Sequence, residues 1–96
     1  MKTKEFLSTS ISLVEGDRQK DYGDKLHNHT NIAKLWSAYL DTEVSAHDVA
    51  ILMALLKVAR TKLGQVSDDT YVDMSAYSAI AGEIKFRTSK KEKGNE

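Results

Sequence analysis

The side chains best suited to bind a ligand are charged groups near the ends of two predicted helices. Lys57 and Arg60 are spaced i, i+3, so they project as neighbouring cations from the end of a strongly apolar segment. Asp69 and Asp73 are spaced i, i+4 and place two carboxylates on one face of the next predicted helix. If the two helices form an antiparallel hairpin, we expect the two cations to stand opposite the two carboxylates.

Two interpretations of this charged group are open. In the first, Lys57, Arg60, Asp69 and Asp73 form an interhelical salt-bridge network that fixes the hairpin, and the acids are also favourable near a helix N-terminus. In the second, the group is a polar pocket in which the cations hold a phosphate and the aspartates hold Mg²⁺, since hard oxygen ligands suit that metal. The first interpretation is structural and the second is functional.

A second polar group, Arg18, Tyr22 and Asn28, lies in a turn where neither core packing nor helix propensity demands these residue types. Such a group can bind phosphate, stack on a ring and hydrogen-bond a base edge. His27 and His29 are spaced i, i+2 and do not share a helical face, which excludes a two-histidine zinc site of the i, i+4 kind. We therefore expect both histidines to be surface or capping residues.

One predicted helix, residues 48–60, is apolar on almost every side, so it is expected to be the central helix and to be covered on most sides. Ser45 and Asp48 form a Ser-x-x-Asp variant of the capping box at its start. Apolar periodicity predicts further helices at residues 4–16, 28–40 and 70–86, with Trp36 and Tyr39 in the core and Gly64 suited to end the central helix.

The expected fold is an all-α, four-helix domain over residues 1–86 with an antiparallel C-terminal hairpin. Short connections between helices favour antiparallel neighbours, and the first two helices should cover the central one. Residues 87–96 are charged and lack periodicity, which predicts a disordered, flexible tail.

Composition limits the partners. Fourteen basic and fourteen acidic residues cancel among 96, which removes the usual electrostatic signature of a nucleic-acid or membrane-surface binder. The absence of cysteine excludes disulfides and thiolate metal sites. No apolar run reaches membrane-spanning length and no signal peptide is evident, so we expect a cytoplasmic protein. A core of this size favours a homo-oligomer, with the first helix contributing to the contact.

Several segments follow one another in a characteristic order: Arg-x-x-x-Tyr-Gly ending at Gly23, Asp-Val-Ala-x-Leu-Met-x-Leu-Leu-Lys-x-Ala-Arg ending at Arg60, and Asp-x-x-x-Asp-x-x-x-Tyr ending at Tyr77. Together they resemble a family of small uncharacterised domains common in bacteriophages and prophages, and the resemblance covers about residues 10–83. It departs at Ala76, where glycine is expected, and after Gly23, where proline would be usual. The last two segments are also similar to phage nucleotide-modification-associated domains and, more distantly, to all-α nucleoside triphosphate pyrophosphohydrolases of the MazG and dUTPase kind.

That distant similarity implies Mg²⁺ as a cofactor, yet the metal-binding Glu-x-x-Glu of those enzymes occurs nowhere in this chain. The leading hypothesis is therefore a phage accessory protein that binds a nucleotide or a phosphate-bearing derivative without catalysis and without a metal. Arg18, Lys57 and Arg60 would contact phosphate, and Tyr22 and Asn28 the base. The alternatives are a module that binds and inhibits a host protein and a divergent MazG-like pyrophosphohydrolase.

Overall fold

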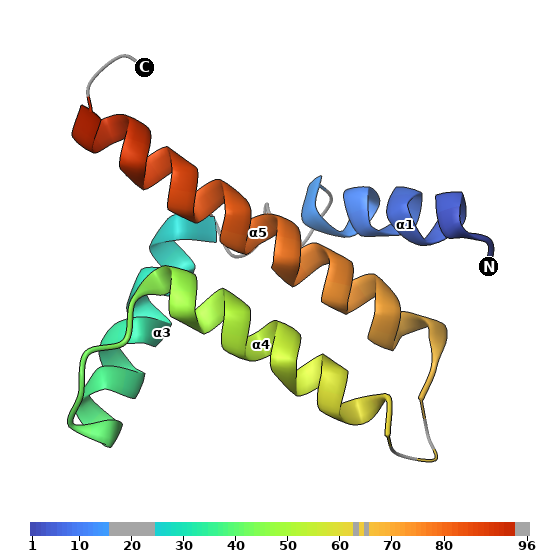
Figure 1. Ribbon diagram of the computed structural model, residues 1–96, viewed down its shortest axis with the longest axis horizontal. Helices are drawn as coiled ribbons and strands as arrows, with labels where there is room; N and C mark the ends of the chain where they lie inside the picture. The colour runs from blue at the N-terminus through green and yellow to red at the C-terminus, as the bar shows by residue number, and fades with distance from the viewer. Residues whose placement is uncertain (16–24, 63, 65, 94–96) are drawn as a thin grey trace.

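The chain is entirely helical wherever a computed structural model describes regular structure, namely within residues 1–15, 25–62, 64 and 66–93, with side chains as far as Arg87. The helices are α1 (Thr3–Glu15), α3 (Lys25–Leu40), α4 (Ala46–Arg60) and α5 (Asp68–Lys93) (Figure 1). They confirm the predicted all-α, four-helix class. None of the described helices has the length and apolar character needed to cross a membrane.

The last two helices, α4 and α5, form the predicted antiparallel hairpin and lie side by side in Figure 1. Two of the predicted ends differ. Thr61 is the C-cap of α4 in right-handed geometry, and its N–H donates to the Val58 carbonyl at 3.0 Å, so Gly64 does not end this helix. The backbone of α5 continues to Lys93, beyond the predicted end at residue 86. The prediction of a flexible tail covers residues 87–96. Apart from Arg87, the side chains of these residues lie outside the described part of the chain.

The central helix is α5, and not α4 as the apolar pattern of α4 predicted. It packs against α1 and α4, and it meets α3 through the His29–Tyr77 ring contact and the Lys25–Glu83 ion pair. Figure 1 shows α1 and α4 on opposite sides of α5, and α1 packs against α5 while α3 packs against α4. The prediction that the first two helices both cover the central helix is therefore wrong for α1. Most buried apolar residues are small and lie on α4 and α5, which lets the two backbones approach closely: Ala33, Val49, Ala50, Val72, Ala76, Ala81 and Ile84.

Ser45 and Asp48 form reciprocal hydrogen bonds at the start of α4. The Asp48 N–H donates to Ser45 Oγ at 3.0 Å, and the Ser45 N–H donates to Asp48 Oδ2 at 3.0 Å. These reciprocal bonds satisfy two backbone donors that a helix start leaves open, and they confirm the predicted capping box.

A left-handed residue and a serine set the turn from α3 into α4. Asp41 has φ 54°, and the Thr42 N–H donates to the Ser37 carbonyl at 3.2 Å, the bond of a Schellman ending. The Ser37 hydroxyl then accepts from the Val44 N–H at 2.9 Å and donates to the Val44 carbonyl at 3.2 Å. As a result α3 lies beside the N-terminal end of α4 and points away from it, instead of running antiparallel along it (Figure 1).

Candidate functional site

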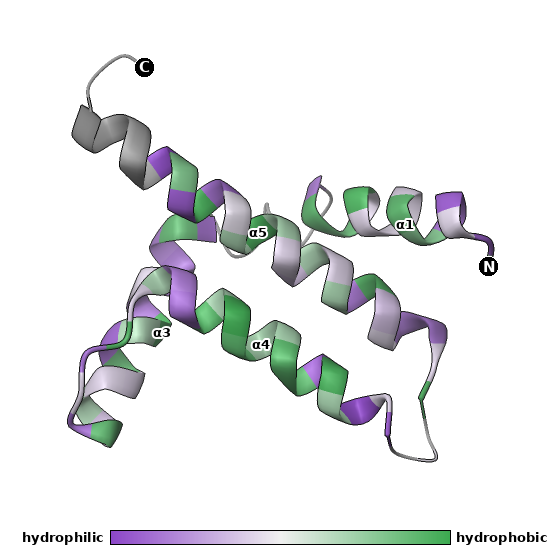
Figure 2. Ribbon diagram, viewed as in Figure 1, coloured by the Kyte–Doolittle hydropathy of each residue, from purple (hydrophilic) through white to green (hydrophobic). Residues whose placement is uncertain are grey.

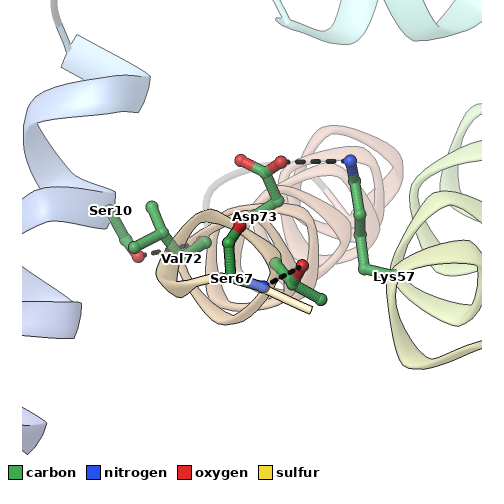
Figure 3. Close-up of polar contacts among 6 residues, drawn as sticks. Ser10, Lys57, Ser67, Val72 and Asp73 are labelled. Atoms are coloured by element: carbon green, nitrogen blue, oxygen red, sulfur yellow. Dashed lines mark hydrogen bonds and ion pairs between the residues drawn. The ribbon is translucent and has the colours of Figure 1, made fainter. Parts of the chain in front are cut away.

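The predicted charged group lies between the C-terminal half of α4 and the first turns of α5. Lys57 Nζ lies 3.1 Å from Asp73 Oδ2, and the two side chains are 18% and 24% exposed. Figure 3 shows the two side chains pointing toward each other from neighbouring helices. The attraction between charges that are mostly removed from water is screened less by salt than that of a surface pair. The Lys57–Asp73 pair therefore favours one register of α4 against α5.

The other two members of the predicted group lie apart from this pair. Arg60 and Asp69 are both exposed, and no ion pair joins either of them to another described residue. The expected arrangement of two cations opposite two carboxylates is therefore reduced to Lys57 with Asp73. Arg60 lies in the last turn of α4, where a cation is also favourable next to the helix dipole.

The opposite side of α5 is held by α1. The buried Ser10 hydroxyl lies 2.9 Å from the Phe6 carbonyl of its own helix and 3.0 Å from the Val72 carbonyl of α5. Since Val72 and Asp73 are consecutive, one turn of α5 is joined to α1 on one side and to α4 on the other (Figure 3). Ser10 was not predicted to join two helices, although its place on the apolar stripe of its helix is a signal for a buried hydroxyl.

One turn further along α5, Tyr77 meets α3. Its ring lies edge-on to the ring of His29, with centroids 6.5 Å apart. His29 is buried, so the expectation that it is a surface or capping residue is wrong. Its Nδ1 lies 2.9 Å from the Lys25 carbonyl, a contact that requires the proton on Nδ1. The sequence did hold a signal for this burial. His29 lies three residues before Ile32 and four before Ala33, so it shares the face of the helix that packs against its neighbours.

Of the second predicted group, only Asn28 falls in the described part of the chain. It is half-buried in the first turn of α3, next to His29. Arg18 and Tyr22 lie outside the described residues, so their expected approach to a phosphate and a base stays a prediction.

At the start of α4, hydrogen bonds from Ser45 hold the Asp48 carboxylate in its charged form by lowering its pKa. The Ser45 backbone N–H, which donates to the carboxylate, lowers the pKa of Asp48, and the Ser45 hydroxyl and His47 act in the same direction against partial desolvation.

Within the described residues, no three His, Asp or Glu side chains gather in a way that could hold a metal ion.

Two of the segments that carry the resemblance, those ending at Arg60 and at Tyr77, lie on α4 and α5. The segment ending at Gly23 lies outside the described residues. Comparison with known proteins supports the family. The profile of a domain of unknown function, DUF6378, matches residues 5–85. The chain belongs to the DUF6378 family. It is 41% identical over 75 residues to the Gene 55 protein of Mycobacterium phage L5, covering 77% of this chain and 48% of that protein. It is 38% identical over 82 residues to the Gene 55 protein of Mycobacterium phage D29, covering 85% of this chain and 54% of that protein.

These matches confirm the resemblance to an uncharacterised family with phage-encoded members. The chain spans about half the length of the curated DUF6378 relatives it matches. No solved structure matches it. Ala76, where the resemblance led us to expect glycine, is buried.

Proposed function

We propose that this DUF6378 chain is a non-catalytic phage accessory module that works by binding the apolar face of a protein helix along the outer side of α4. The observation that supports this proposal is the exposure of large aliphatic side chains on that helix: Ile51, Leu52, Leu55, Leu56 and Val58. Hydrophobic colours dominate the middle of α4 in Figure 2. A continuous apolar face of this kind on a small domain is typical of an interaction site.

The pairing of Lys57 with Asp73 favours a binding function over catalysis. Asp73, half-buried, has Lys57 as its ion-pair partner, which leaves neither group free to act on a ligand without breaking the hairpin contact. This geometry supports the structural interpretation of the pair. The partner protein would be a host factor if the module acts as an inhibitor.

A photocrosslinking amino acid placed at Leu55 tests the proposal in cells. We expect discrete protein adducts from this position and none from a matched probe at Lys85, which is exposed on α5. Far-UV circular dichroism of the purified variants confirms that both fold. If a folded variant with the probe at Leu55 gave no adduct, the proposed function would be wrong.

A second candidate, binding of a nucleotide or a phosphate-bearing derivative, is favoured by Arg60, which is exposed and has no ion-pair partner among the described residues. It lies one turn beyond Lys57, and Arg18, Tyr22 and Asn28 would complete the site. Thermal shift with mono-, di-, tri- and cyclic nucleotides tests it, because a ligand at 100 times its Kd adds about 2.7 kcal/mol of stability. A shift that Arg60→Gln abolishes would favour this candidate, and no shift with any nucleotide would count against it.

The third candidate is a divergent MazG-like pyrophosphohydrolase in which Asp69 and Asp73 hold Mg²⁺. The supporting feature is their shared face of α5, and the opposing one is the ion pair of Asp73 with Lys57. A metal at Asp73 would have to displace the lysine. Metal-dependent release of pyrophosphate is the assay that separates this candidate from the other two.

A further inference from the structure

We infer that the partner of the outer α4 face is a second copy of this chain, with the two α4 helices packed antiparallel about Leu55. This inference rests on the proposed function, because it names the helix that occupies the same face. It starts from the helical positions of the exposed residues. Ile51, Leu55 and Val58 follow one another at i, i+4 and i+7, and Leu52, Leu56 and Ala59 form the adjoining row.

The face of α4 directly opposite is the one that the chain itself covers. Val49 and Ala50 are buried, and Met53 and Lys57 are half-buried against the neighbouring helices. The helix is therefore apolar on both sides while its own chain covers one side. A helix that is hydrophobic all round is normally buried all round, which leaves the outer face without its expected cover.

The size of the face fits a dimer of small subunits. The exposed fractions of its large aliphatic side chains amount to roughly 400 Å² of apolar surface. A standard interface buries about 800 Å² on each partner, of which about 56 to 65% is apolar, or about 450 to 520 Å². The outer face of α4 supplies most of that apolar share by itself.

The arrangement of residues on the face is self-complementary under a two-fold axis through Leu55. Reversing the helix about this residue exchanges Ile51 with Ala59 and Leu52 with Val58, so small and large side chains meet across the contact. The exposed Asp48 lies seven residues before Leu55, on the same face, and would be placed opposite the exposed Lys62 of the other copy, seven residues after Leu55. Opposite charges at the two ends, together with opposed helix dipoles, favour the antiparallel pairing over the parallel one.

Sedimentation velocity of the full chain from about 1 to 100 μM, a range that spans typical affinities of such interfaces, tests the pairing. We expect a dimer, and we expect Leu55→Glu to weaken it by at least about 30-fold, because it places like charges together at the centre of the contact. The matched control is Ile11→Glu on α1, since Ile11 and Leu55 are each 55% exposed. Unchanged helicity by circular dichroism shows that both variants fold.

The chain has no cysteine, so any disulfide between two copies must come from a cysteine introduced on purpose. Such a disulfide shows which positions of the two copies lie close together, and it needs no charge in the contact. With diamide as the oxidant of the paired thiols, Leu55→Cys should form a disulfide-linked dimer, and Ile51→Cys should link to Ala59→Cys but not to itself. A monomer at every concentration, a dimer that survives Leu55→Glu, or a dimer broken by Ile11→Glu instead would overturn the pairing. Self-linking of Ile51→Cys would overturn its antiparallel direction.

The failure of this inference differs from the failure of the proposed function. A purified monomer whose Leu55 probe nevertheless captures a different protein in cells overturns the second copy and leaves the proposed function standing. A probe at Leu55 that captures nothing in cells overturns the proposed function.

Discussion

Asp73→Asn should lower the free energy of unfolding by about 1 to 2 kcal/mol, between the cost of about 1 kcal/mol or less for an exposed pair and 3 to 5 kcal/mol for a fully buried one. The estimate follows from the geometry, because Lys57 Nζ lies 3.1 Å from the carboxylate while both side chains keep about a fifth of their surface in water. Removal of the carboxylate leaves the lysine charge partly desolvated and without its ion-pair partner. For a domain of this size the melting temperature should fall by about 5 to 15 °C.

A double-mutant cycle isolates the pair itself. Lys57→Met, Asp73→Asn and the double variant are unfolded in urea, and we expect the double variant to lose about 1 kcal/mol less than the sum of the single changes. Most of this coupling should persist in about 1 M salt, since a half-buried pair is screened weakly. A coupling energy of zero would refute the contact as a stabilising link between α4 and α5.

Asp69→Asn is the matched control, because it makes the same chemical change one turn earlier on the same helix, at an exposed position. We expect it to change stability by less than about 0.5 kcal/mol. Equal losses from the two aspartate variants would mean that the cost comes from the helix start and not from the ion pair.

Three further predictions follow from the other described contacts. The capping box lowers the pKa of Asp48. The stability that the Asp48 carboxylate contributes is therefore fully present above its unfolded pKa of about 3.9 and is lost as pH falls through the lower folded pKa. By urea unfolding, Asp48→Asn should be less stable than wild type at pH 7 and nearly as stable as wild type near pH 2. Ser10→Ala should cost about 1 kcal/mol and speed amide exchange in α1, because it removes the hydroxyl that joins α1 to α5, whereas Ser8→Ala, at an exposed position, should change neither quantity. No common nucleoside triphosphate should release pyrophosphate with Mg²⁺ or Mn²⁺; turnover that Asp73→Asn abolishes without lowering the melting temperature would show instead that Asp73 is catalytic.

Local signals in the sequence were sufficient for the helices and for several of their ends. The capping box at Ser45 and Asp48 depends on residues three apart, so the sequence contains all of its parts. The antiparallel hairpin of α4 and α5 likewise follows from a short connection between two apolar segments. The pairing of Lys57 with Asp73 could be anticipated as part of a larger group, because helical spacing places each residue on the facing side of its helix.

The sequence could not show how completely each face is covered. The apolar character of α4 predicted burial on most sides, but burial depends on which helices lie nearby, and α1 packs on α5 instead. The same reason explains Tyr39, expected in the core and found 89% exposed at the end of α3 that points away from α4. His29 shows the reverse error, since a polar residue becomes buried when a neighbouring helix covers it and a backbone carbonyl satisfies its ring.

Periodicity and capping, which act within a few residues, were therefore determined by the sequence alone. The order of helices around α5, the reduction of a four-residue charged group to one ion pair, and the uncovered face of α4 were decided by tertiary packing. Each of these depends on contacts between residues far apart in the chain, such as Ser10 with Val72, which no local pattern specifies.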